Sequence, residues 1–252
     1  MRQVRIIMGT PITIEIVDRE AAQKLFDEVF EYFTYVDEKF STYKESSEIT
    51  AINQRKVKNN AYSEDMKIVL ELSEETKQLT GGYFDIVTPE GVYDPSGLVK
   101  GWAIFNAAKI LKSHSVHNFY VEAGGDIQTS GLNSLGEAWI IGIQNPFSKK
   151  REVVKTVHLR DMGIATSGSY VRGKHIYNPV DKTREIRHVL SITVIGPNIY
   201  EADRFATAAY AMGSAGIDFI EQLEGFEGYS IDDKGIATMT TGFNNYLNKT
   251  YA

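Results

Sequence analysis

Two kinds of hydrophobic periodicity divide this sequence, and their order constrains the fold more than any other feature. Apolar residues recur at helical spacing in the segments 18–43, 63–79 and 96–112. Short segments typical of strands follow at 118–131, 138–146, 152–159, 163–171 and 189–196. This order lacks the strict strand–helix alternation of a doubly wound sheet. We therefore predict an α+β fold in which helices pack on a mainly antiparallel sheet.

Local signals add detail at both ends of the chain. Residues 3–17 predict a strand pair or one bent strand, with a turn or bulge near Gly9 and Pro11. Ser63 is a predicted N-cap and Gly81 follows the predicted end of the same helix, while Ser96 is the N-cap candidate of the next one. An alanine-rich helix over 201–213, the segment "IDFIEQLEG" at 217–225 and strands near 227–231 and 235–240 complete the chain. No repeat or linker-like segment divides the 252 residues, so we expect a single domain over 1–252.

Composition restricts the possible chemistry. The chain has no cysteine, which excludes disulfides, zinc–thiolate sites, iron–sulfur clusters and a cysteine nucleophile. Its five histidines show no metal-ligand spacing. Any metal site must then be rich in oxygen, which favours Mg²⁺ or Ca²⁺ over zinc. The net charge of −6, without a basic run, argues against a nucleic-acid partner.

The start of the chain already alternates like a strand and lacks the long apolar core of a signal peptide. No stretch is long and apolar enough to span a membrane. We therefore expect a cytoplasmic protein without a membrane span, although a chain trimmed of its leader would look the same.

Asp203 and Thr207 form a candidate metal-binding pair, although an Asp-x-x-x-Thr spacing is common by chance. They lie four residues apart, so they share one face of the predicted helix 201–213. A carboxylate and a hydroxyl on one face offer two hard oxygen ligands, which suits Mg²⁺. The alternative is structural: a threonine that bonds its own helix carbonyl, and an aspartate favoured by the helix dipole.

Two glycine-containing motifs have open interpretations. In "DPSGLVKGWA", Lys100 lies in the first turn of a helix, where a cation is unfavourable unless an anion binds there. A solvated lysine is the simpler alternative. In "EAGGDI", the glycine pair Gly124–Gly125 either lets backbone approach a ligand or makes a turn.

Two further motifs combine aromatic and polar side chains. In "TGGYFDIVTP", Tyr83 and Phe84 precede Asp85, so the rings either stack on a flat ligand or belong to the core. In "GKHIYNP", His175 is either a general base or a structural histidine. It has no serine or cysteine partner in a recognisable local motif, so a hydrolase triad is not supported.

Seven motifs in order resemble those of the ApbE family of FAD:protein FMN transferases. They extend from about Met8 to Gly213 and read "MGTPITIEI", "DEKFSTYKESSEITAIN", "TGGYFDIVTP", "DPSGLVKGWAI", "EAGGDI", "GIATSGSYVRGKHIYNP" and "EADRFATAAYAMG". Each motif is weak alone, but their shared order is specific. The resemblance implies a single ApbE-like, T-fold-like domain.

The resemblance also implies a reaction. Such a protein binds FAD with Mg²⁺, and a Thr or Ser hydroxyl of an acceptor flavoprotein attacks the FMN phosphorus. FMN becomes attached through a phosphoester bond and AMP leaves. Two alternatives stay open: a Mg²⁺-dependent FAD pyrophosphatase that gives FMN and AMP, and a non-catalytic FAD-binding protein.

The resemblance carries roles to individual residues. Implied contacts with FAD are Met8, Tyr43, Tyr83, Phe84, Asp85, Asp94, Lys100 and Tyr177. The implied metal ligands are the Gly97 carbonyl and the side chains of Asp203 and Thr207. The implied catalytic residues are His175, as the base that takes the hydroxyl proton, and Asp203. The sequence departs from the family pattern at Ala206, where some members have an acidic residue, and at Phe105–Asn106, where many have an aspartate.

Overall fold

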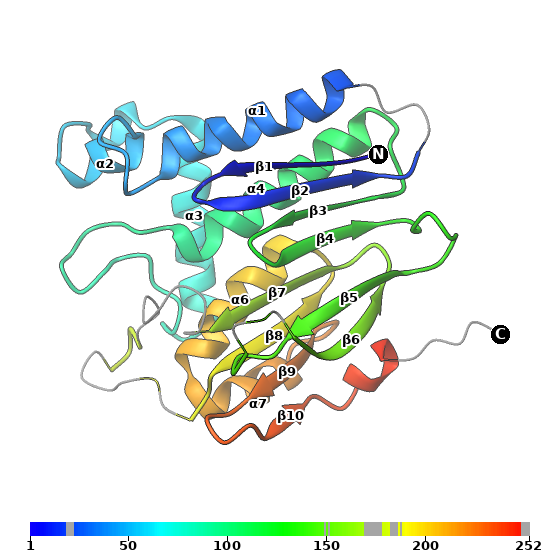
Figure 1. Cartoon of the computed structure of the whole chain (residues 1–252). Helices are drawn as coiled ribbons and strands as arrows, with labels where there is room; N and C mark the ends of the chain where they lie inside the picture. The colour runs from blue at the N-terminus through cyan, green and yellow to red at the C-terminus, as the bar shows by residue number, and fades with distance from the viewer. Residues whose placement is uncertain are drawn as a thin grey trace.

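The computed structural model describes residues 1–18, 23–148, 150, 152–168, 178–181, 186 and 188–247. Its main element is an eight-stranded sheet in the order β1-β2-β3-β4-β7-β8-β9-β10, in which every neighbouring pair is antiparallel (Figure 1). The strands are β1 (Arg2–Ile7), β2 (Thr10–Ile16), β3 (Phe119–Ala123), β4 (Asp126–Ser130), β7 (Gly163–Gly168), β8 (Ser191–Gly196), β9 (Glu227–Ile231) and β10 (Ala237–Met239). The predicted α+β class is confirmed.

A separate antiparallel hairpin consists of β5 (Trp139–Gln144) and β6 (Val153–Leu159). It lies over β7 and β8 on the near side of the sheet in Figure 1. Its inward side chains Ile143, Val157 and Leu159 pack in a buried cluster with Ile164 of β7 and Ile195 of β8. The hairpin therefore covers only part of this face.

Helices cover the opposite face of the sheet. They are α1 (Gln23–Phe40), α2 (Glu48–Asn53), α3 (Glu64–Leu79), α4 (Ser96–Ser113), α6 (Ile199–Ala211) and α7 (Gly216–Glu221), with short 3₁₀ turns η1 (Asn59–Ala61) and η2 (Gly213–Ala215). A third 3₁₀ turn, η3 (Phe243–Tyr246), packs instead with the hairpin. None of these described helices is long and apolar enough to cross a membrane.

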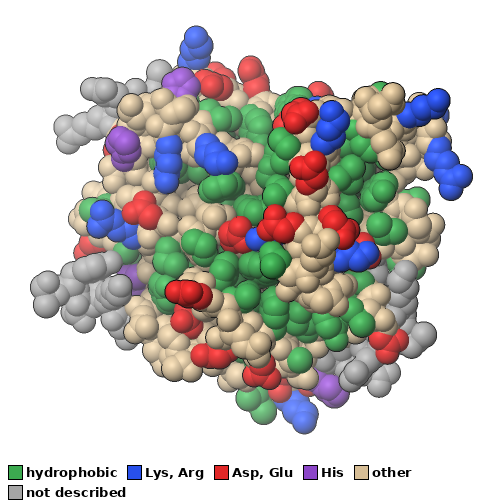
Figure 2. All heavy atoms as spheres, turned by 180° about the vertical axis from the view of Figure 1, so that it is seen from behind, with side chains coloured by type: hydrophobic (Ala, Val, Ile, Leu, Met, Phe, Trp, Pro, Cys, Tyr) green, Lys and Arg blue, Asp and Glu red, His purple; other side chains and the backbone are tan. Residues whose placement is uncertain are grey.

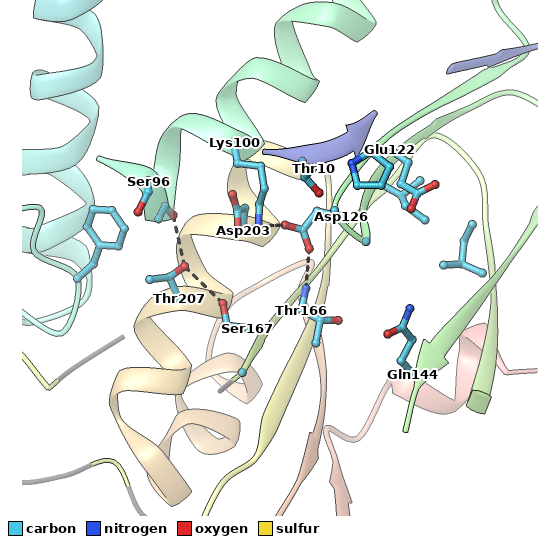
Figure 3. A pocket seen from close by; sticks show the side chains of 18 of the residues that line it. Thr10, Ser96, Lys100, Glu122, Asp126, Gln144, Thr166, Ser167, Asp203 and Thr207 are labelled. Atoms are coloured by element: carbon cyan, nitrogen blue, oxygen red, sulfur yellow. Dashed lines mark hydrogen bonds and ion pairs between the residues drawn. The ribbon is translucent and has the colours of Figure 1, made fainter. Parts of the chain in front are cut away.

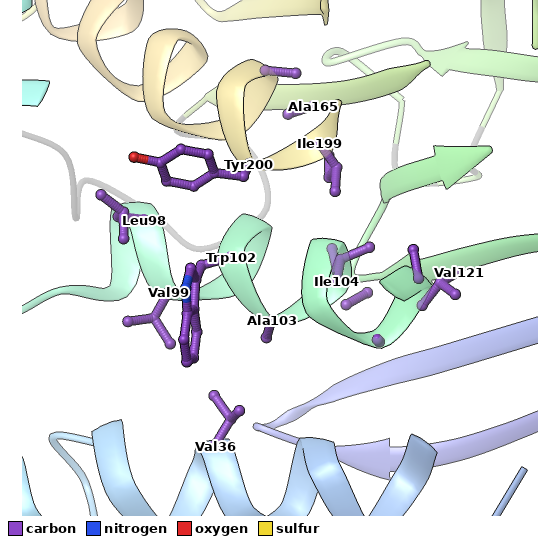
Figure 4. Packing of buried hydrophobic residues seen from close by; sticks show 14 of the residues in the cluster. Val36, Leu98, Val99, Trp102, Ala103, Ile104, Val121, Ala165, Ile199 and Tyr200 are labelled. Carbon is purple, nitrogen blue, oxygen red and sulfur yellow. The ribbon is translucent and has the colours of Figure 1, made fainter. Parts of the chain in front are cut away.

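The main core lies between the helices and the sheet. Figure 4 shows Trp102 and Ile104 of α4 between Val36 of α1 and the residues of α6 and the sheet. Strand β2 shows how the layers form: Ile12, Ile14 and Ile16 are fully buried under the helices. Thr13, which points the other way, lines a cavity on the open face. Seen from behind, the surface intersperses acidic and basic side chains, as an ordinary solvated protein surface does (Figure 2).

The local signals hold in most places. Ser63 caps α3 by accepting the Met66 N–H at 3.3 Å, and Gly81 beyond the helix has φ +59°. Met8 and Gly9, both with positive φ, form the two-residue turn between β1 and β2. Pro11 is not in the turn but pairs within β2.

Two local expectations need correction. Ser96 is the first residue of α4 and not its cap, because Asp94 accepts the Ser96 N–H at 3.1 Å and Pro95 occupies the cap position. The six-residue helix α2 was not predicted, because it contributes only two buried apolar residues and no readable period.

Candidate functional site

A cavity of about 1010 Å³ lies on the open face of the sheet, beside the hairpin. Its inner end lies where the first turns of α4, the middle of α6 and the ends of β4 and β7 meet (Figure 3). Charged and hydroxyl side chains gather at this inner end, namely Lys100, Asp126, Thr166, Ser167, Asp203 and Thr207. These residues come from four elements that are distant in sequence.

Lys100 lies between two buried carboxylates. Its Nζ contacts Asp126 Oδ2 and lies 3.7 Å from Asp203 Oδ1. The side chains of Asp126 and Asp203 are 1% and 4% exposed, while that of Lys100 is 19% exposed. When Lys100, Asp126 and Asp203 are all ionised, the three side chains together carry a net charge of −1. Burial makes such an excess costly unless a further cation or hydrogen-bond donor compensates it.

Backbone donors hold both carboxylates in place. Asp126 Oδ1 accepts the Thr166 N–H at 2.9 Å, and Asp203 Oδ2 accepts the Gly101 N–H at 2.8 Å. The second contact requires glycine, because a Cβ at position 101 would lie 2.6 Å from Asp203 Cβ. Gly101 therefore allows α6 to pack closely against α4, and Lys100 lies beside Asp203 of α6.

A row of neutral oxygens lies next to this cluster. Thr207 Oγ1 donates to the Gly97 carbonyl at 3.3 Å and lies 3.4 Å from Ser167 Oγ. The Thr207 hydroxyl thus bonds across to α4 and not to its own helix. Both side chains of the Asp203–Thr207 pair make contacts between α4 and α6, and their role as metal ligands stays a prediction.

These oxygens fit a hard divalent cation. A carboxylate, a hydroxyl and a backbone carbonyl are oxygen ligands of the kind that Mg²⁺ takes. Among the described residues, no three acidic or histidine side chains group as a metal site. Oxygens of water and of a ligand would therefore have to complete the coordination.

The loop after α3 forms another part of the cavity wall. Phe84 is 3% exposed and its N–H donates to Thr80 Oγ1 at 3.0 Å, so it is a core residue beneath the loop. Asp85 accepts the Val87 N–H at 2.9 Å and pairs with Lys77 at 2.8 Å, which raises the pKa of that lysine. Tyr83 and Asp94 also line the cavity.

Two predicted site residues are not among those that line this cavity, and two others lie outside the described residues. Met8 lies in the β1–β2 turn and Tyr43 is 97% exposed, and neither is among the residues that line it. His175 and Tyr177 lie outside the described residues. Their roles stay predictions.

Sequence reasoning missed Asp126, which completes the Lys100 cluster. The motif "EAGGDI" contains it, but the glycines are the distinctive residues of that motif, and they form the β3–β4 turn with φ +61° and +99°. A carboxylate that opens a fully buried strand was the available signal. Ser167 was missed for a simpler reason, since a serine in a strand carries no distinctive pattern.

The sequence profile of the ApbE family matches residues 8–92 and 88–229 of this chain. A protein of Vibrio cholerae named FAD:protein FMN transferase is 36% identical over 133 residues, which are 50% of this chain and 40% of that protein. The protein of the same name from Escherichia coli K12 is 30% identical over 155 residues, 58% of this chain and 44% of that one. The chain thus matches less than half the length of either relative.

Solved structures extend the likeness to almost the whole fold. The flavin transferase ApbE from Vibrio cholerae is 26% identical, with a TM-score of 0.85 over 98% of this chain and 99% of that one. The ApbE protein of Thermotoga maritima is 20% identical, with a TM-score of 0.86 over 99% of both chains, which shows a shared fold.

Proposed function

The chain belongs to the ApbE family, and from this premise we propose that it is an FAD:protein FMN transferase. It would attach FMN from FAD to a Thr or Ser hydroxyl of an acceptor flavoprotein and release AMP. The names of the relatives support this proposal, as does the likeness to a flavin transferase over 98% of the chain.

One observation carries the proposal: a lysine held between two buried carboxylates faces a cavity large enough for a dinucleotide. Pyrophosphate cleavage needs positive charge on the phosphate oxygens and a fixed orientation of the attacking group. The side chain of Lys100 is 19% exposed and lines the cavity, so an anion there can reach its charge. Asp126 and Asp203 fix its position, so little reorganisation is needed when an anion arrives.

The bond changes are simple. The acceptor oxygen attacks the phosphorus of the FMN half, and the bond from that phosphorus to the bridging oxygen breaks. AMP leaves with the bridging oxygen and its electron pair, and the hydroxyl proton passes to a base and then to solvent or AMP. His175, which lies outside the described residues, is the base that family membership suggests.

We propose Mg²⁺ as the metal, held by Asp203, Thr207 Oγ1 and the Gly97 carbonyl. When bound, it would neutralise negative charge on the pyrophosphate oxygens. Lys100 and the first turn of α4 would hold the same anion from the protein side. Tyr83 would contact the ring system at the cavity wall.

The test is AMP release from FAD by the purified chain, with and without Mg²⁺ and with and without an acceptor flavoprotein domain. Covalent flavin on the acceptor is followed by in-gel fluorescence. AMP together with a fluorescent acceptor band is the expected result. FMN and AMP without a labelled acceptor would replace transfer by pyrophosphatase activity, and bound FAD without AMP would make the site a binding site only.

A further inference from the structure

Strand β5 presents an unpaired edge to the cavity. It pairs with β6 alone among the described strands, so its second edge has no strand neighbour there. Four consecutive residues, Trp139 to Gly142, line the cavity, and so does Gln144. Successive side chains of a strand point to opposite faces. A cavity that meets four residues in a row must therefore meet the strand along its edge.

The floor beside this edge has a different character. Arg2 and Val4 of β1, Thr13 of β2, and Tyr120 and Glu122 of β3 line it. On β1 and β3 the contributing residues alternate, so the cavity meets these two strands on one face. The cleft is thus bounded by a strand edge on one side and a sheet face below. A polypeptide in extended form fits this pair of walls.

Apolar side chains lie exposed along the cleft. Ile140 is 55% exposed and Val4 is 51% exposed, although both line the cavity. An uncovered edge flanked by apolar side chains is the kind of surface that natural proteins usually protect. It suits an occupant that supplies both backbone hydrogen bonds and apolar side chains.

The reaction itself limits what can enter. A serine or threonine hydroxyl lies close to its own backbone, and the carboxylates around Lys100 are no more than 4% exposed. The acceptor backbone must therefore reach into the cavity, which a helix or a flat folded surface cannot do. Figure 3 shows Gln144, at the end of β5, across the cavity from Lys100 and Asp126.

We propose that the free edge of β5 binds the acceptor as an added strand, and that this strand delivers its hydroxyl to the Lys100 cluster. The proposal rests on the proposed transferase function and specifies the partner as an extended segment with apolar side chains beside its Thr or Ser. Main-chain pairing would supply affinity with little dependence on sequence. Val4 and Ile140 would select for apolar neighbours.

The test uses the purified chain with FAD, Mg²⁺ and a library of linear peptides with a central threonine and randomised flanks. Mass spectrometry gives the ratio of flavin-labelled peptide to free FMN. Ile140→Asp is expected to lower this ratio about fivefold through the lost cross-strand apolar contact. Ile236→Asp is the matched control, because Ile236 is an equally exposed isoleucine (60%) that does not line the cavity.

Hydrogen exchange of the backbone amides provides a second readout with the most strongly labelled peptide and no FAD. Exchange in 139–144 should slow, while exchange in β10, an edge strand that does not line the cavity, stays unchanged. An unchanged ratio in Ile140→Asp, or unchanged exchange in β5, would overturn the proposal. AMP release without any peptide labelling would overturn strand addition and leave FAD cleavage standing. If neither AMP release nor labelling is seen, strand addition and the proposed transferase function are both overturned.

Discussion

The apolar core and the inner end of the cavity differ in what burial accomplishes. In the core, side chains such as Ile12, Ile14 and Phe33 are fully buried against other apolar groups. At the inner end of the cavity, burial instead surrounds charge, with Lys100 between two carboxylates that are no more than 4% exposed. The first arrangement stabilises the fold and the second keeps electrostatic interactions strong. Helices α4 and α6 connect the two, because each has one side in the core and another at the cluster.

The largest expected effect separates chemistry from stability. Asp203→Ala removes a carboxylate from the cavity side and leaves Lys100 paired with Asp126. We expect Mg²⁺-dependent AMP release to fall about 10²–10³-fold, the range seen when one electrostatic stabiliser is removed. The midpoint of urea unfolding should stay close to that of the unsubstituted protein. Asp218→Ala, an exposed helical aspartate on α7, is the matched control, and full activity of Asp203→Ala would remove the metal assignment.

Gly101→Ala disturbs the contact between α4 and α6, which joins the core to the charged cluster. The new Cβ would lie 2.6 Å from Asp203 Cβ and 2.9 Å from the Ile199 carbonyl oxygen, so α4 and α6 must move apart. Such overpacking costs about 1–3 kcal/mol of unfolding free energy, which chemical denaturation measures. Gly97→Ala is a milder comparison, since its nearest contact would be 3.1 Å from Thr207 Cγ2. Equal losses in both variants would contradict the role of close approach at Gly101.

A substitution at Arg204 tests the contribution of the packed helices to stability without changing the charged cluster. Its guanidinium is buried and donates to Glu201 at 2.8 Å and to Glu75 and Thr76 at 3.1 Å, which ties α6 to α3. Arg204→Met should lower the unfolding free energy by about 1–2 kcal/mol, because the exposed Glu75 regains water while Thr76 loses a donor. Transfer by the folded fraction should stay unchanged. A loss of activity without a loss of stability would show that Arg204 influences the charged cluster at the cavity.

The smallest effect is a dependence of stability on alkaline pH. Burial raises the pKa of Tyr200, on the helix side, to about 12, and that of Tyr120, at the cavity, to about 12. Between the unfolded pKa near 10 and these values, only the unfolded chain loses the phenolic proton. The unfolding free energy must then fall as pH rises through this window.

Replacement by phenylalanine checks the assignment. Tyr200→Phe and Tyr120→Phe should each flatten the decline of unfolding free energy above pH 10, measured by urea unfolding at several pH values. An unchanged slope in both variants would mean that other groups cause the decline.

Much of the fold could be predicted because its signals are local. Apolar spacing found α1, α3, α4 and α6, and alternation with turn residues found the strands, since a helix or a strand repeats its pattern within a few residues. Helix α2 escaped because it is too short to show a period. The detachment of β5–β6 from the main sheet escaped because strand pairing depends on distant partners.

The sequence by itself determined the residue types of the site and the face shared by Asp203 and Thr207, because helical geometry follows from spacing alone. Only the tertiary structure decided that Asp126 meets Lys100, that Gly101 admits Asp203, and that Phe84 is buried while β5 leaves an edge open. These are contacts between elements far apart in the chain. Packing of the whole domain selects them, and no local period encodes them.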